Sequence, residues 1–391
     1  MKGRSILTIG ALAAGLAAAT ALRAEEPLVL GYSMAKTGPF VSLANSNELA
    51  ADMAVEEINA AGGVNGHRIE LVKFDTAGDP TQAAVAVRKF ARDEGALAVI
   101  GPFSSSEAKV AFPAGERLGI AQMSMASSAP NLAKPYKFAF RNTTDEFTVI
   151  TLVLQTIRDA GLPAGSASIA YATDDTVSKV IGTKVLPKVL GDAGYEPKQV
   201  VTFKYAAFDL SPQVSRLAQT PADLIGLGAP PEASIKLAKE MRRQGLEGRI
   251  FGGTTVADVE LPKRMDGAGE GMVIGTTFYE GVNDRTREFA AKFAERAGAA
   301  GLSRTEANQF DAATYDIVHL YAEAMKVAGT TGAAADLQAE RAAIVEALNG
   351  LRDFPSLEGP ITFGDNGDAL KPLYVLEIRD GAWSLLGTQE R

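Results

Sequence analysis

The sequence predicts an α/β protein built from two doubly wound lobes with largely parallel sheets. Short apolar runs alternate with longer segments of helical periodicity, the order expected of parallel strands joined by covering helices. Two such sets follow one another in similar order. The length of 391 residues suggests two or three domains at roughly 150 residues each, and a hydrophobic content of 46% suffices for their cores.

The first set occupies the N-terminal part of the chain, where turn and cap signals separate its elements. Gly62-Gly63 stops the first helix, Asp79-Pro80 caps and opens the second, and Gly101-Pro102 breaks the third strand. These signals predict strands at 28–34, 69–74, 97–100 and 121–124, and helices at 47–61, 80–94 and 107–118.

The second set continues the same alternation toward the C-terminus. It predicts strands at 168–172, 200–204, 224–227, 249–252 and 272–276, separated by helices at 147–160, 175–193 and 231–244. Three further helices and two strands complete the chain, at 286–298, 310–328, 335–350, 360–363 and 373–378.

Residues 1–24 read as a secretory signal peptide. Lys2 and Arg4 precede an apolar stretch over 6–19, and 22–24 offers a cleavage site. A retained membrane anchor is the alternative, but the stretch is short for a span of about 20 residues. No later segment is long and apolar enough to insert into a membrane, so we expect an exported, soluble mature chain.

Composition excludes several kinds of site and partner. The chain has no Cys and two His, which argues against disulfides, thiolate ligands and multi-histidine metal centres. A net charge of −8 argues against nucleic acid as a partner. No metal and no cofactor are therefore expected. Nothing indicates obligate oligomerisation, so a monomer is predicted.

Ligands in open α/β sheets bind beyond the carboxyl ends of the strands. That rule selects six loops, which are rich in Ser, Thr and Gly and carry no nucleotide fingerprint. The loops are 33–43, 102–106, 125–129, 172–178, 228–231 and 253–255.

Two serine clusters stand out in these loops. Ser104, Ser105 and Ser106 lie between a strand end and a helix start, where hydroxyls, free N–H groups and the helix dipole suit a carboxylate. The alternative is that one serine only caps the helix. Ser127 and Ser128 follow the neighbouring strand. Both clusters would face one point if strands 97–100 and 121–124 are adjacent.

Several short motifs, in this order and spacing, are typical of one family. They are Gly31-Tyr32-Ser33 with Thr37-Gly38-Pro39, the segment 54–66 (AVEEINAAGGVNG), Asp75-Thr76-Ala77-Gly78-Asp79-Pro80, Val99-Ile100-Gly101-Pro102 and Phe140-Arg141. Through them, almost the whole mature chain resembles type I periplasmic solute-binding proteins, in the Leu/Ile/Val-binding-like branch that serves ABC importers.

The resemblance implies two lobes joined by a three-segment hinge, closing on a ligand in the periplasm. After the signal peptide it assigns 25–143 plus 277–370 to lobe 1, and 144–276 plus 371–391 to lobe 2. It also implies an inner-membrane ABC permease as the partner.

The resemblance further implies individual ligand contacts. Ser105, the backbone at Ala126 and Ser128 match positions that hold a ligand carboxylate, with Phe103 and Ser104 as neighbouring wall positions. Leu43 stands where an aromatic wall residue is frequent. Phe310 matches an apolar wall position, and a helix-core role for it stays equally open.

The second lobe departs from the family pattern. Thr254 stands where amino-acid binders have an acid that pairs with the ligand ammonium, and Ala229 and Ser178 stand at aromatic positions. Asp258 or Glu280 could substitute, although their expected places are on the surface. The ligand is therefore either a hydrophobic or branched-chain amino acid or a carboxylate without an amino group, such as an aromatic or aliphatic acid. A small amide is a more distant option.

The expected function is solute binding and delivery, without catalysis. A ligand sensor for a membrane receptor is one alternative, since it would share the fold. An exported serine hydrolase is the other, but neither His67 nor His319 follows a strand end near the serines, and no Gly-x-Ser-x-Gly elbow is present. Arg141 and Asp145, near the first crossover, suggest either hinge electrostatics or a surface ion pair.

Overall fold

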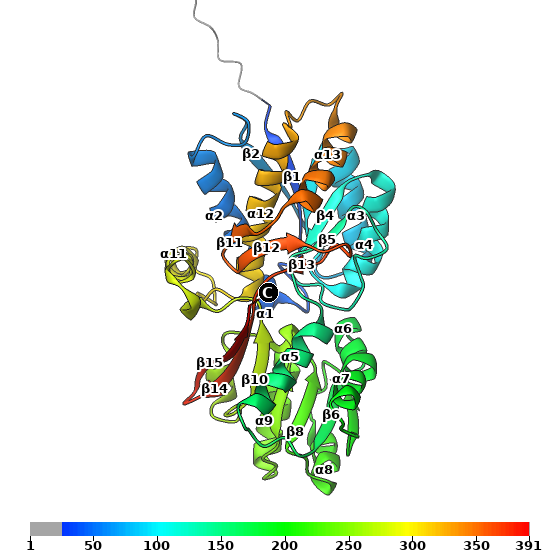
Figure 1. Cartoon of the computed structure of the whole chain (residues 1–391), viewed down its shortest axis with the longest axis vertical. Coiled ribbons are helices and arrows are strands. Elements are labelled where there is room, and N and C mark those ends of the chain that lie inside the picture. Colours follow the sequence, from blue (N-terminus) through cyan, green and yellow to red (C-terminus); the bar gives the residue numbers. More distant parts are fainter. Residues whose placement is uncertain (1–25, 391) are drawn as a thin grey trace, which may run out of the picture.

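The computed structural model describes residues 26–390, which form two α/β lobes stacked along the long axis of the molecule (Figure 1). The predicted signal peptide lies outside the described residues. Within 26–390, no helix combines the length and the apolar character that a bilayer crossing requires. The predicted fold class is confirmed.

The first lobe is built on a five-stranded parallel sheet in the order β2-β1-β3-β4-β5. Its strands are β1 (Leu28–Met34), β2 (Ile69–Asp75), β3 (Ala98–Ile100), β4 (Ala121–Ser124) and β5 (Ala139–Arg141). β3 and β4 pair directly, so the condition under which the two serine clusters would face one point is met.

Helices cover both faces of this sheet because consecutive strand residues point to opposite sides. Val99 faces α3 (Pro80–Arg92) and α4 (Ser105–Leu118). Ala98 and Ile100 face the cluster that contains α2 (Asn47–Ala60), α12 (Gln309–Ala328) and α13 (Leu337–Gly350). The short α1 (Val41–Ala44), α11 (Asp284–Ala299) and a small sheet of β11 (Phe354–Ser356), β12 (Gly359–Phe363) and β13 (Ala369–Leu370) complete this part.

The second lobe has a seven-stranded sheet in the order β15-β14-β10-β9-β8-β6-β7. Its parallel strands are β6 (Ala167–Ala172), β7 (Val200–Phe203), β8 (Leu224–Gly228), β9 (Arg249–Gly252) and β10 (Val273–Thr276). β14 (Leu373–Arg379) and β15 (Ala382–Gln389) join antiparallel at one edge. The helices are α5 (Glu146–Asp159), α6 (Thr176–Val180), α7 (Leu186–Asp192), α8 (Ser211–Gln219), α9 (Pro231–Arg243) and α10 (Leu261–Met265).

The structure differs from the sequence prediction in several elements. α1, β5, α8, α10, β11, β13 and β15 were not predicted. Except for α8 and β15, these elements have five residues or fewer and carry too little periodicity to be recognised. The helix predicted over 175–193 is broken by a π-helical turn at Ile181–Val185. Gly182 allows this turn to approach the sheet closely: a Cβ there would lie 2.0 Å from the Tyr171 ring.

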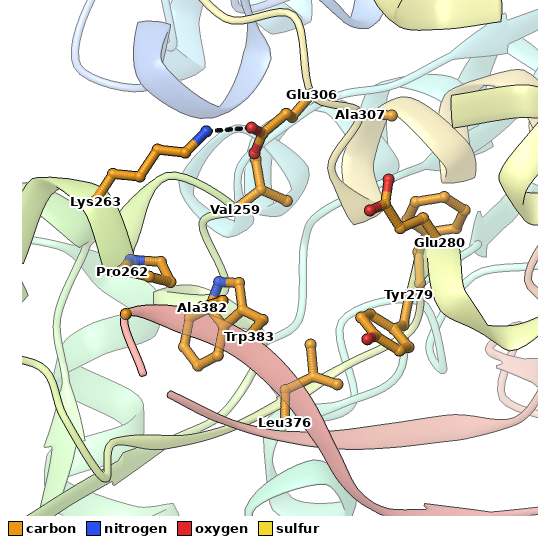
Figure 2. A pocket seen from close by; sticks show the side chains of 12 residues that line it. Val259, Pro262, Lys263, Tyr279, Glu280, Glu306, Ala307, Leu376, Ala382 and Trp383 are labelled. Carbon is orange, nitrogen blue, oxygen red and sulfur yellow. Dashed lines mark hydrogen bonds and ion pairs between the residues drawn. The ribbon is translucent and has the colours of Figure 1, made fainter. Parts of the chain in front are cut away.

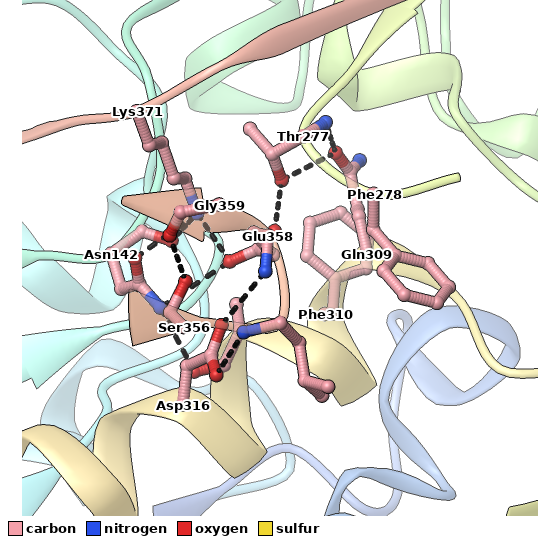
Figure 3. A network of polar contacts seen from close by, with 12 residues as sticks. Asn142, Thr277, Phe278, Gln309, Phe310, Asp316, Ser356, Glu358, Gly359 and Lys371 are labelled. Atoms are coloured by element: carbon pink, nitrogen blue, oxygen red, sulfur yellow. Dashed lines mark hydrogen bonds and ion pairs between the residues drawn. The ribbon is translucent and has the colours of Figure 1, made fainter. Parts of the chain in front are cut away.

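A buried polar network ties together the three segments that pass between the lobes (Figure 3). Glu358 accepts hydrogen bonds from the Thr277 hydroxyl and from the Asn142 amide at 3.4 Å, and forms an ion pair with Lys371. Lys371 also donates to the backbone carbonyl of Asn142 at 2.9 Å. Asn142 follows β5, Thr277 follows β10 and Lys371 precedes β14, so one carboxylate connects all three segments. The exact division into lobes at residues 143, 276 and 370 stays a prediction.

Glu358 should make the stability of the protein depend on pH. Burial raises the pKa of its carboxyl to about 7, against the opposing effect of Lys371, while nearby Asp316 adds to the rise. The folded state thus holds this proton more tightly than the unfolded state, whose Glu pKa is about 4.3. The stabilisation that this proton provides is complete below the unfolded-state pKa and is lost as the pH rises to about 7.

The test is urea unfolding of wild type and Glu358→Gln at pH 5 and pH 8. Between pH 5 and pH 8, the free energy of unfolding of the variant should rise by about 2–3 kcal/mol relative to that of wild type. The reason is that each pH unit between the two pKa values corresponds to about 1.4 kcal/mol. A stability difference that stays constant with pH would contradict the prediction.

Candidate functional site

All six loops selected from the sequence meet at one small cavity between the two lobes. Its volume is about 40 Å³. The lining residues are Phe40, Leu43, Phe103, Ser104, Ser105, Ala126, Ser128, Asp175, Val177, Pro230, Thr254, Thr255 and Phe310. Phe310, at the start of α12, is the one contributor from outside the loops. The expectation that the strand-end loops face a common cleft is confirmed.

The lobes touch across this cleft. The Ser106 hydroxyl at the start of α4 donates to the Thr176 hydroxyl of α6 at 2.8 Å. The Tyr205 hydroxyl donates to the carbonyl of Pro39 at 3.2 Å. Each bond joins a residue of the first lobe to one of the second, so the described conformation is a closed one.

Three phenylalanines form the apolar wall. The ring of Phe103 lies 5.6 Å from that of Phe40 and 5.4 Å from that of Phe310, the latter in an edge-on arrangement. Edge-on and tilted aromatic contacts of this kind hold rings in place. Phe310 therefore takes part in both the wall and the core of the lobe, rather than in only one of the two.

The serines of the first cluster have two roles: Ser104 caps a helix, and Ser105 presents its hydroxyl to the cavity. Ser104 is the N-cap of α4 in a capping box with Glu107, so its hydroxyl is used within the protein. The oxygen of Ser105 accepts the N–H of Ala129 at 3.2 Å, which leaves the Ser105 proton available to the cavity. The first-turn N–H groups of α4 lie beside it, where a helix favours negative charge.

The second serine cluster sits in a loop that is fixed from behind by Arg141. The guanidinium donates to the carbonyls of Ser127 at 2.6 Å and Ala129 at 2.7 Å. It also forms a bidentate pair with Asp368, both N–O distances being 2.6 Å. Arg141 has no exposed surface. The interpretation as a surface ion pair with Asp145 is therefore wrong, and Asp145 instead caps α5 through the N–H of Phe147 at 2.9 Å.

Two of the candidate contact residues do not line the cavity. The Ser127 side chain is buried in its own loop, and its carbonyl points back to Arg141. Ala229 is fully buried at the end of β8, and the next residue, Pro230, forms the wall in its place. Ser178 is likewise turned inward, with its hydroxyl donating to Asp175 at 2.6 Å.

The two acids considered as substitutes for the missing ammonium partner lie elsewhere. Asp258 is buried and forms an ion pair with Arg264 at 3.3 Å. Glu280 lines a separate cavity of about 260 Å³ together with Tyr279, Trp383 and the Lys263–Glu306 ion pair (Figure 2). That second cavity shares no lining residue with the cleft.

A buried acid that the sequence analysis missed lies behind the cleft. Glu146, the first residue of α5, accepts hydrogen bonds on Oε1 from three hydroxyls: Thr254 at 2.5 Å, Thr255 at 2.7 Å and Ser128 at 3.0 Å. Burial raises the pKa of its carboxyl. No motif marked this residue, because two of its three hydroxyl partners, Thr254 and Thr255, come from a loop more than a hundred positions later in the chain.

Five wall residues were also missed, namely Phe40, Asp175, Val177, Pro230 and Thr255. All five lie inside loops that the strand-end rule selected, so the rule located the loops without identifying which side chains turn inward. Neither histidine lines the cavity, and His319 instead stacks on Tyr315 at 4.6 Å. Among residues 26–390, no cluster of His, Cys, Asp or Glu is arranged to hold a metal ion.

Comparisons with known proteins agree with this architecture. The family model described as periplasmic binding protein matches residues 27–382. Leu/Ile/Val-binding protein homolog 1 of Brucella suis is 26% identical over 354 residues, covering 89% of each chain. A leucine-binding protein of Thermotoga maritima superimposes with a TM-score of 0.80 at 22% identity, covering 93% of this chain and 99% of its own.

A second solved structure has a different ligand. It is a solute-binding protein of an ABC transporter from R. palustris in complex with 4-hydroxybenzoate. Its TM-score is 0.80 at 17% identity, covering 93% of this chain and 97% of that chain. From the family match over most of its length, the chain belongs to the periplasmic binding protein family, in the type I class that includes the Leu/Ile/Val-binding proteins.

Proposed function

We propose that the protein captures a small carboxylate-bearing ligand between its lobes and delivers it to an ABC importer in the inner membrane. The observation that carries the proposal is the Ser105 end of the cleft. There a hydroxyl proton that has no acceptor among residues 26–390 and the N-terminus of the 14-residue helix α4 face one small cavity. This combination favours an anionic oxygen.

The relatives support a transport role. The Brucella suis relative is named for Leu, Ile and Val, and the R. palustris neighbour holds an aromatic acid. A carboxylate is common to both kinds of ligand. Export through a signal peptide at residues 1–24 and action as a periplasmic monomer belong to the same proposal.

Binding is expected to be coupled to closure of the lobes. The Ser106–Thr176 and Tyr205–Pro39 contacts join residues of different lobes, so they form only when the lobes approach. A ligand that touches both lobes favours this state by the difference in its affinity for the closed and open forms. The proposal includes no catalytic step, since the cavity wall offers no histidine base beside its serines.

Ser105→Ala should weaken binding of a carboxylate ligand by about 10- to 100-fold, because a hydrogen bond to a charged group contributes about 1.5–3 kcal/mol. Calorimetric titration of the purified mature protein provides the measurement. The panel holds hydrophobic amino acids, aromatic acids, aliphatic acids and small amides.

Ser33→Ala is the matched control. Ser33 lies one residue before the end of β1, is similarly buried, has a hydroxyl without a hydrogen-bond partner and does not line the cavity. Its loss should leave affinity unchanged. Equal affinities of the Ser105 and Ser33 variants would refute the assignment of the anion site. Chemical conversion of a bound ligand would refute the transport proposal.

A further inference from the structure

Three hydroxyls of the cavity wall are organised by one buried carboxylate. Oε1 of Glu146 accepts the hydroxyls of Ser128, Thr254 and Thr255 and, at 3.1 Å, the backbone N–H of Thr255. The backbone N–H of Glu146 donates to the Ser128 carbonyl at 3.0 Å. The acid is fully buried and lies behind the wall, whereas its three hydroxyl partners line the cavity.

This arrangement fixes the direction of the hydroxyl protons. A hydroxyl has one proton and two acceptor lone pairs. Because Ser128, Thr254 and Thr255 give their protons to Glu146, they offer only lone pairs to the cavity. These three hydroxyls therefore accept hydrogen bonds from a ligand, whereas Ser105 can donate one.

The charge of Glu146 is not compensated within the protein. No cationic side chain among residues 26–390 forms an ion pair with it, and its Oε2 has no hydrogen-bond partner. A buried carboxylate without a counter-charge is costly. Burial raises the pKa of this group, as expected for a charge without a partner. A cation bound next to the three hydroxyls would supply the missing positive charge.

We propose that Glu146 is the positioning residue that selects ligands bearing a protonated amine as well as a carboxylate, which makes the ligand class a small amino acid. The amine donates to the lone pairs of Thr254, Thr255 and Ser128, so Ser128 serves the amine and not the carboxylate to which the family resemblance assigned it. Glu146 acts through those hydroxyls without touching the ligand. The carboxylate meets Ser105 and the start of α4. This inference rests on the proposed function, since it names the ligand class of that same cleft.

In the family resemblance, Thr254 stands where amino-acid binders have the acid that pairs with the ligand ammonium. The sequence therefore left open whether the ligand is an amino acid. The structure supplies an acid from another element, the first turn of α5, which reaches Thr254 from behind. Asp175 is the one acid that lines the cavity directly. Its Oδ2 is taken by the N–H of Ser178 at 2.9 Å and the Ser178 hydroxyl at 2.6 Å. Because Glu146 gathers three hydroxyl acceptors, we assign the amine to that side and treat Asp175 as the rival.

The experiment compares affinities for amino acids and for the same molecules without the amino group. The pairs are leucine with 4-methylpentanoate, phenylalanine with 3-phenylpropanoate, and alanine with propanoate, each measured by calorimetry. Wild type should prefer the amino acid of its best pair by at least 100-fold. Glu146→Gln should reduce that preference by at least tenfold, while affinity for the deaminated acid changes less than threefold.

Two further variants keep the test decisive. Thr255→Val removes a half-buried cavity hydroxyl and should lower the same preference even if Glu146→Gln folds poorly. Asp258→Asn replaces a buried acid outside the cavity and should leave the preference unchanged.

The outcomes separate this inference from the function it rests on. If Glu146→Gln lost equal affinity for the amino acid and for its deaminated counterpart, the role of Glu146 would be structural only. If Asp175→Asn lost the preference for amino acids over deaminated acids and Glu146→Gln kept it, Asp175 would be the residue that binds the amine. Preference of wild type for deaminated acids would also overturn the inference while leaving the transport function intact. Failure to bind any carboxylate would overturn the proposed function itself.

Discussion

Replacing Arg141 with alanine is expected to lower the free energy of unfolding by about 3–5 kcal/mol, because it leaves Asp368 as a buried charge without its partner. Arg141 has no exposed surface, and both oxygens of Asp368 are bonded to it at 2.6 Å. The same change frees the carbonyls of Ser127 and Ala129, so ligand affinity should fall as well. Urea unfolding followed by circular dichroism measures the first effect, and calorimetry the second.

Two comparisons isolate the cause. The double variant Arg141→Met with Asp368→Leu should recover part of the lost stability, since no unpaired charge remains. Arg243→Ala removes an exposed pair with Glu240 and should cost less than about 1 kcal/mol. A loss for Arg141→Ala no larger than that for Arg243→Ala would show that the buried pair does not support the loop.

Gly253→Ala is expected to destabilise the protein by about 3 kcal/mol, near the upper end for overpacking, and to weaken ligand binding at least tenfold. A Cβ at Gly253 would lie 1.7 Å from Oε2 of Glu146 and 3.2 Å from Ile150. The Glu146 side chain cannot move away without breaking hydrogen bonds, because its Oε1 accepts the hydroxyls of Thr254 and Thr255. Thermal unfolding and calorimetric titration measure the two effects.

Gly298→Ala provides the control in the same protein. Gly298 lies in α11, and a Cβ there meets no atom within 4 Å. Alanine should raise stability by about 0.5–1 kcal/mol, because it is the better helix former. If Gly253→Ala kept wild-type stability and affinity, Glu146 would have to move freely, which would contradict its fixed position behind the cavity wall.

The strand-end rule explains how much of the site could be predicted. It selected every loop that reaches the cavity, because alternating strands and helices fix the edge of a parallel sheet at which the loops lie. It did not decide which side chains in a loop turn inward. Pro230 takes the place expected of Ala229, and Ser127 turns away while Ser128 lines the cavity.

The long-range polar contacts could not be predicted at all. Arg141 was identified but its partner was not, since Asp368 is 227 positions away in the sequence. Glu146 was not identified as a candidate site residue, because its role in the site depends on its contacts with Thr254 and Thr255. Nothing in local periodicity reports such contacts.

The sequence by itself determined the α/β class, the order of most strands, the two-lobe plan and the serine clusters. These features follow from local hydrophobic periodicity, turn residues and helix caps, which act over a few residues. Only the tertiary structure decided which acid supports the cleft and which hydroxyl protons face the ligand. Those properties depend on the meeting of distant segments in a buried environment, where every charge and hydrogen bond must find a partner.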